Sequence, residues 1–108
     1  MNTPSNAKLI ALDAAKWKSG LDFYKAILPA IGAPEWHGTS VNALVDSMIW
    51  GNFNTVSPPY IVEIRSTKNL PAEIMQELTW AREDIIEARN EYKKKRGCDV
   101  EVDFKIVD

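Results

Sequence analysis

Apolar and polar residues alternate along the chain with two different periods, which predict strands and helices respectively. Residues 7–12 and 60–64 are short apolar runs of strand length, although a buried helical turn at 7–12 has the same periodicity. Residues 100–107 alternate apolar and polar positions, as in a strand with one buried face. Between these runs, apolar residues recur every three or four positions, as on one face of a helix. The predicted order is strand, helix, helix, strand, helix, strand.

The first two predicted helices follow recognisable N-terminal signals. Ser19 and Asp22 have the spacing of an N-cap and a first-turn carboxylate, and this helix is expected to end near Gly32. The second helix begins after Thr39 or Ser40 and runs through the segment VNALVDSMIW. The apolar face of the first helix is expected to hold Leu21, Tyr24, Ile27 and Leu28. In the second, Val41, Leu44, Val45 and Met48 are expected on the core face, and Asn42, Asp46 and Ile49 on another face.

The longest helical pattern opens at Asn69 and Pro71 and closes at Gly97, a residue type that often follows the last helical turn. A basic run, Lys93–Arg96, falls in the last turn, where cations meet the negative end of the helix dipole. A break near residues 79–80 is left open by the pattern. The apolar stripe consists of Ile74, Leu78, Ala81, Ile85, Ala88 and Tyr92.

This order of elements indicates the fold class. Strands separated by helices pair in parallel through right-handed crossovers. We therefore expect an α/β fold in which a small three-stranded parallel sheet is packed with helices. A chain of 108 residues with 45% apolar and 26% charged residues has the size and composition of one domain. That domain is expected over residues 7–108, after a polar and flexible N-terminus at residues 1–6.

Charge and cysteine content narrow the possible functions. The net charge of −2 and the acidic pI of about 5.4 argue against a surface that binds nucleic acid. The lone Cys98 allows no internal disulfide, is expected to be a small buried thiol, and suits a reducing cytosol. The chain has neither a secretory signal pattern nor an apolar run long enough to cross a membrane. A cytoplasmic protein that binds neither membrane nor nucleic acid is expected.

The sequence lacks most of the residue arrangements that catalysis requires. His37 is the only imidazole, the glycines are scattered rather than grouped in a phosphate loop, and neighbouring carboxylates such as Glu83 and Asp84 are typical of a solvated helix face. We expect no catalytic residue, no metal and no cofactor. Trp17 and Trp80 are expected to pack in or beside the core. Trp36 and Trp50, at the two ends of the second helix, are candidates for contacts with a partner.

Four short motifs occur together in a characteristic order. They are APEWHG at 33–38, VNALVDS at 41–47, the strand after Pro59, and Gly97-Cys98-Asp99 before the last strand. From Ala7 onward the chain resembles the barstar family, whose members are intracellular inhibitors of a secreted ribonuclease. The resemblance implies a barstar-like fold that binds a cognate nuclease toxin one-to-one and occludes its active site.

The resemblance also implies which residues meet the partner. Asp46 matches the central acidic residue of the family, and Trp36 matches the aromatic residue that stacks at the nuclease cleft. A carboxylate on a rigid helix can take the place of a phosphate among the cations of such a cleft. The partner-binding residues implied around the loop and second helix are Trp36, His37, Gly38, Asn42, Val45, Asp46, Ile49 and Trp50, with Glu91 on the long helix.

The sequence departs from the family pattern at several of these positions. Asn42 stands where the family has a carboxylate, Val45 where it has a tryptophan, and Tyr92 where it has a glutamate. The expected contact surface is therefore less acidic and more apolar, with Trp50 and the loop through Phe53 available for apolar contacts. A different ribonuclease, or a toxin that is not a ribonuclease, fits such a surface better than barnase itself.

A second hypothesis belongs to another class of function. Open parallel sheets bind ligands beyond the carboxyl ends of their strands. In this chain those ends carry Asp13 and residues 66–69. A small metabolite-binding or regulatory α/β domain is therefore the alternative, and a small hydrolase acting through His37 is a third possibility.

Overall fold

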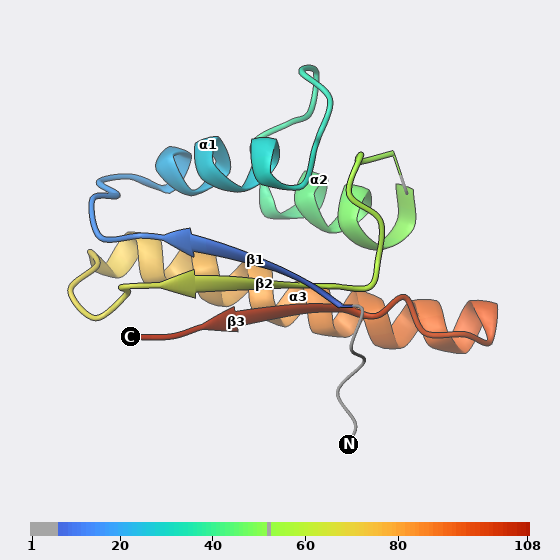
Figure 1. Cartoon of the computed structure of the whole chain (residues 1–108). Coiled ribbons are helices and arrows are strands. Elements are labelled where there is room, and N and C mark those ends of the chain that lie inside the picture. Colours follow the sequence, from blue (N-terminus) through green and yellow to red (C-terminus); the bar gives the residue numbers. More distant parts are fainter. Residues whose placement is uncertain (1–6, 52) are drawn as a thin grey trace.

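The computed structural model describes residues 7–51 and 53–108, and it has the element order expected from the sequence (Figure 1). The expected flexible segment 1–6 lies outside the described residues, as does residue 52. The elements are β1 (Lys8–Asp13), α1 (Gly20–Ala30), α2 (Val41–Val45), η1 (Asp46–Gly51), β2 (Tyr60–Arg65), α3 (Ala72–Arg96) and β3 (Val102–Ile106).

The three strands form one parallel sheet in the order β1-β2-β3. Ile10 pairs with Val62, which pairs with Phe104, and these side chains are buried beneath the helices. The opposite face is open, since Leu9 on that face is 52% exposed. The helices thus cover one face of the sheet, because two right-handed crossovers in the same direction place their helices on the same side. The predicted α/β fold is confirmed.

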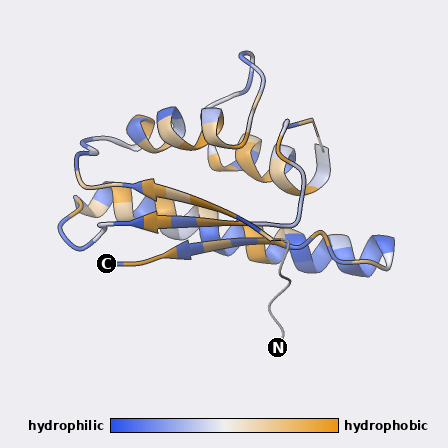
Figure 2. Cartoon of the chain, in the orientation of Figure 1, coloured by the Kyte–Doolittle hydropathy of each residue, from blue (hydrophilic) through white to orange (hydrophobic). Residues whose placement is uncertain are grey.

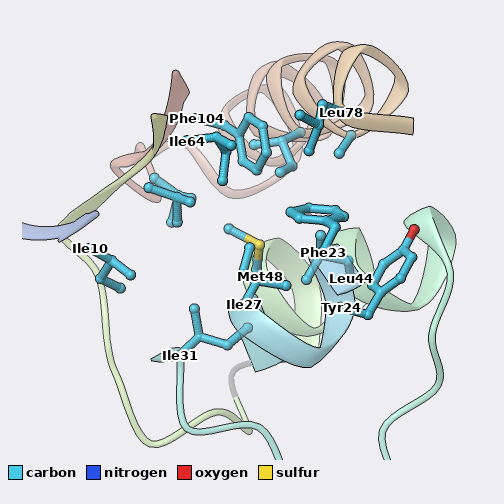
Figure 3. Close-up of a cluster of buried hydrophobic side chains, with 14 of the residues drawn as sticks. Ile10, Phe23, Tyr24, Ile27, Ile31, Leu44, Met48, Ile64, Leu78 and Phe104 are labelled. Carbon is cyan, nitrogen blue, oxygen red and sulfur yellow. The ribbon is translucent and has the colours of Figure 1, made fainter. Parts of the chain in front are cut away.

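The core lies between the covered face of the sheet and the layer of helices packed on it. Figure 3 shows Phe23 and Ile27 of α1 converging with Met48 and Phe104, and the ring of Phe23 meets the ring of Phe104 edge-on at 6.0 Å. One predicted core position in α1 is wrong, since Leu21 is 47% exposed whereas Phe23 is fully buried. The buried face of α1 is centred between Phe23 and Ile27, so Leu21 falls beside it.

The second predicted helix is helical throughout but changes its geometry halfway. The Ser40 hydroxyl caps α2 by accepting the N–H of Ala43 at 3.1 Å, and the wider π-type turn of η1 begins at Asp46. A π turn holds one more residue than an α turn, so consecutive residues rotate less about the axis. Ser47, Met48 and Ile49 therefore all face the interior. The prediction that Ile49 shares an exposed face with Asp46 is wrong, because Ile49 is only 3% exposed.

Helix α3 is continuous over its 25 residues, so the break considered near residues 79–80 is absent from it. Gly97 ends it in the left-handed conformation (φ 74°), as expected. The predicted stripe is buried from Ile74 to Ala88, and Figure 2 shows the C-terminal end of this helix as mostly hydrophilic. Two expectations of burial are wrong. Trp80 is 51% exposed because it lies one residue off the stripe, and Cys98 is exposed in the turn before β3.

Candidate functional site

Two loops that are separate in the sequence lie side by side at one end of the helical layer. The N–H of Thr55 donates to the carbonyl of Gly32 at 3.0 Å, and the N–H of Val56 donates to the carbonyl of Ile31 at 3.1 Å. Gly32 has φ 70°, and a Cβ there would collide with Thr55, so glycine is required for this close approach. The backbone pairing brings the segment after η1 against the loop that precedes α2.

The two loops present a pair of exposed aromatic rings. The centroids of Trp36 and Phe53 are 5.1 Å apart with an interplanar angle of 36°, and Trp36 is 73% exposed. Both rings line a pocket of about 190 Å³ together with Gly38 and Asp46. We call this cavity the aromatic pocket. Aromatic faces next to a carboxylate provide the two groups that attract a guanidinium or an ammonium, through cation–π contact and through charge-assisted hydrogen bonds.

Asp46 also borders a second and larger cavity. This cavity, the acidic groove, has a volume of about 520 Å³ and lies between the second helix and α3. Its carboxylates are Asp46, Asp84, Glu87 and Glu91. The residues that line the groove in the described part of the chain include no cationic side chain. Carboxylates that share one concave surface create a negative potential, which attracts a cationic partner over distances of about a Debye length.

Two cations of the basic run of α3, Lys95 and Arg96, lie over aromatic rings beside the acidic groove. The Trp50 ring packs on the Tyr92 ring with centroids 5.4 Å apart, and the Lys95 ammonium lies 5.7 Å from the Trp50 centroid. The Arg96 guanidinium covers Tyr92 in the same way at 5.5 Å. Trp50 is therefore partly buried between η1 and α3, where it supports one wall of the groove.

Most of the residues predicted to meet a partner are brought together on this surface. Trp36 and Gly38 line the aromatic pocket, and Asp46 lies between the two cavities. Asn42, Val45, Trp50 and Glu91 line the acidic groove. Ile49 is only 3% exposed and lines neither cavity, and its contact with a partner stays a prediction. His37 borders the aromatic pocket but is only 8% exposed, and its ring nitrogens lie against Gly38 and Ser47, so its contact with a partner also stays a prediction.

The predicted contact set lacked the carboxylates that α3 contributes to this surface besides Glu91, since Asp84 and Glu87 also line the acidic groove. The sequence did contain a signal that these carboxylates share a helix face, since positions 84, 87 and 91 follow the helical spacing of three and four. That spacing places them on one face of α3, but it does not say that this face borders the second helix. The loop through Phe53 was expected to be available for apolar contacts, but its irregular sequence gave no signal that Phe53 pairs with Trp36.

The ends of the strands, which the alternative hypothesis requires, use their polar groups within the protein. The carboxylate of Asp13 accepts the N–H of Ala15 at 3.0 Å, and this hydrogen bond, followed by one from Ser66, lowers the pKa of Asp13. The hydroxyl of Thr67 donates to the carbonyl of Val107 at 2.7 Å. Asp13 and Ser66 do meet there, and both residues are exposed, so only part of their hydrogen-bonding capacity is used within the protein.

No similarity to a known protein assigns a function to this geometry. Neither protein-family models nor curated proteins match this chain. Within residues 7–51 and 53–108, no cluster of three or more His, Cys, Asp or Glu side chains is arranged to hold a metal ion. In the same residues, none of the helices combines the length and the apolar character needed to span a bilayer. The surface around Asp46 is therefore the feature that bears most directly on function.

Proposed function

We propose that this protein is a barstar-like inhibitor that binds one-to-one to a cognate toxic nuclease, most simply a ribonuclease, in the cytosol of the cell that makes it, and occludes the active site. One observation carries the proposal. The exposed carboxylate of Asp46 lies between an aromatic pocket and an acidic groove. The motifs that resemble barstar coincide with this surface, since Trp36 and Asp46 belong to them.

The chemistry of a nuclease cleft explains why such a surface is inhibitory. A cleft that binds polynucleotide phosphates presents arginine, lysine and histidine side chains. A carboxylate on a rigid helix can accept their hydrogen bonds in place of a phosphate, without being cleaved. The exposed ring of Trp36 can stack where a base otherwise stacks. Occupation of both subsites by one surface excludes the substrate.

The distribution of charge supports a partner other than barnase. Relative to the family pattern, Asn42 in place of a carboxylate leaves the second helix with Asp46 as its carboxylate. Asp84 and Glu87 place further negative charge across the groove, on α3. A matching toxin is expected to carry cations that reach α3 as well as cations that surround Asp46.

Recovery of the partner tests the proposal. The chain is purified with an affinity tag from its own cells, and the nuclease activity of any partner is measured alone and after titration with the chain. The expected result is a nuclease that kills cells when expressed alone and loses activity at one equivalent of this protein. A partner without nuclease activity, or a nuclease that keeps its activity in the complex, contradicts the proposal.

A further inference from the structure

Two cations at the C-terminal end of α3 lie over aromatic rings. The Lys95 ammonium is 5.7 Å from the centroid of the Trp50 ring, and the Arg96 guanidinium is 5.5 Å from the centroid of the Tyr92 ring. The two rings pack on each other, and Trp50 also lines the acidic groove. We call Lys95 and Arg96 the cationic edge. The cationic edge therefore adjoins the acidic groove through the ring of Trp50.

The cationic edge does not neutralise the carboxylates next to it. Glu91 lies four positions before Lys95 on α3, which is the spacing at which glutamate and lysine side chains commonly pair on a helix. Within residues 7–51 and 53–108, however, no ion pair joins the cationic edge to a carboxylate. Positive and negative groups therefore stay separate on one surface, and both remain available to a partner.

A role at the end of the helix does not account for this arrangement. Cations in the last turn oppose the negative end of the helix dipole whichever way their side chains point. A lysine in free solvent keeps most of its rotamers, whereas contact with Trp50 restricts those of Lys95. A cation that is already held in place loses less entropy when a partner binds it, so the cationic edge is preorganised for recognition.

The charge of the neighbouring groove indicates what the cationic edge can bind. A cationic group of a partner is attracted to the carboxylates of the groove but is repelled by Lys95 and Arg96. A nucleic acid carries a phosphate on every nucleotide, so a strand that reached the cationic edge would be repelled by the four carboxylates of the groove. A single carboxylate on a protein avoids both penalties. The complementary surface is that of a protein with cations for the groove and an acidic side chain beside them.

We propose that Lys95 and Arg96 bind an acidic side chain of the same protein whose cations occupy the acidic groove, and that this contact fixes the orientation of the partner. A partner turned end for end meets like charges at both places. That the partner is a nuclease rests on the function proposed above. In a nuclease, the acidic side chain is expected beside the phosphate-binding cleft rather than within it, because a carboxylate inside the cleft repels the substrate.

Charge reversal at Lys95 tests the proposal. Lys95→Glu is compared with Lys68→Glu, which makes the same change in net charge at an exposed lysine in the loop before α3. Since α3 has 25 residues, about 37 Å of helix separates this loop from the cationic edge (Figure 1). Lys95→Met removes the charge and keeps most of the apolar stem.

The dissociation constant of each variant is measured at low and high salt with the protein partner that the tagged native chain recovers, before and after nucleic acid is removed by ion exchange. Lys95→Glu is expected to raise the constant about tenfold at low salt, because an attraction becomes a repulsion, and Lys95→Met about threefold. High salt reduces both effects, since the cationic edge is exposed. Lys68→Glu leaves the constant unchanged or lowers it slightly, because the partner is cationic. Thermal midpoints close to the native value show that the variants are folded.

Equal dissociation constants for Lys95→Glu and Lys68→Glu overturn the proposal, and so does tighter binding by Lys95→Glu. An effect of Lys95→Glu that disappears when nucleic acid is removed assigns the cationic edge to phosphates and also overturns it.

The outcomes for the cationic edge and for inhibition are separable. A nuclease that Lys95→Glu and Lys68→Glu inhibit equally well overturns the role of the cationic edge and leaves the inhibitor proposal intact. A partner without nuclease activity contradicts the inhibitor proposal, but the same comparison of variants still decides whether that partner meets the cationic edge. If the native chain binds no protein partner, both proposals fail.

Discussion

The rings of Trp36 and Phe53 face each other at 5.1 Å on the surface, although they belong to loops on opposite sides of the second helix. Trp36 is 73% exposed and Phe53 is 41% exposed, so this pair buries little surface on folding. Exposed aromatic side chains held in a fixed geometry lose little entropy when a partner binds them. The pair is therefore better suited to recognition than to stabilising the fold.

Replacement of Trp36 is expected to separate binding from stability. Trp36→Ala should leave the free energy of unfolding within about 0.5 kcal/mol of the native value, because the side chain is mostly exposed. It should weaken binding to the nuclease by about 2 kcal/mol or more, as for an aromatic residue at an interface centre. Denaturant unfolding and an inhibition constant provide the two measurements. Trp80→Ala, at the exposed tryptophan of α3, is the control and should change neither.

Removal of the carboxylate at the centre of the surface is expected to have the largest effect on inhibition. Asp46→Ala should weaken binding by several kcal/mol, because it leaves cations of the partner unpaired in a buried interface. Isothermal titration or surface plasmon resonance gives the dissociation constant. Glu73→Ala, which removes a carboxylate from the first turn of α3, is the matched control. An unchanged dissociation constant for Asp46→Ala excludes this residue from the mechanism.

The carboxylates of α3 are expected to act mainly on the rate of association. Glu87→Gln should slow association with the nuclease severalfold and reduce its dependence on salt, while dissociation changes less. Stopped-flow measurements at low and high ionic strength separate these effects. If Glu87→Gln leaves the salt dependence unchanged, the acidic groove does not face the cations of the partner.

Burial of Ile49 predicts a structural effect rather than a specific loss of binding. Ile49→Ala should lower the free energy of unfolding by about 2–4 kcal/mol, because it leaves a cavity beneath η1. Ile86→Ala makes the same chemical change at a side chain that is 48% exposed, and should cost less than about 0.5 kcal/mol. Equal effects on the two variants in thermal or denaturant unfolding would contradict the assignment of Ile49 to the core.

The ion pair between Arg89 and Asp99 predicts a change of stability in acid. The Arg89 guanidinium donates to both carboxylate oxygens, at 2.8 and 2.7 Å, and this lowers the pKa of Asp99 from 3.8 to about 2. A lowered pKa in the folded state stabilises the protein above pH 3.8, and the contribution disappears as the pH falls through about 2. The Asp99 side chain is 33% exposed, so solvent screens the pair.

Asp99→Asn should therefore lower the free energy of unfolding by only about 0.5–1 kcal/mol at neutral pH. The difference from the native chain should shrink below pH 4 and vanish well below pH 2, where the native carboxyl is also neutral. Urea unfolding across this pH range measures it. Asp108→Asn at the C-terminal residue is the control, and a difference that persists well below pH 2 would mean that the pair acts through something other than charge.

The local pattern of the sequence was sufficient for the elements and their ends. Period-two and helical spacings placed the strands and helices, and Ser19, Ser40 and Gly97 marked helix termini that the structure confirms. These features depend on residues within a few positions of one another, so backbone geometry and side-chain hydrogen bonds determine them locally. That Trp36 and Asp46 share a partner-binding surface was implied only by the resemblance of the loop and helix motifs to the barstar family.

Tertiary structure decided which of these faces meet. The wide turn of η1 rotates Ile49 into the core, and packing of the second helix against α3 makes one groove from Asp46, Asp84, Glu87 and Glu91. Backbone pairing between the loops brings Phe53 onto Trp36, while His37 turns inward to Ser47. Periodicity specifies which residues share a face, but contacts between distant elements follow from how those faces pack, and no single segment contains that information.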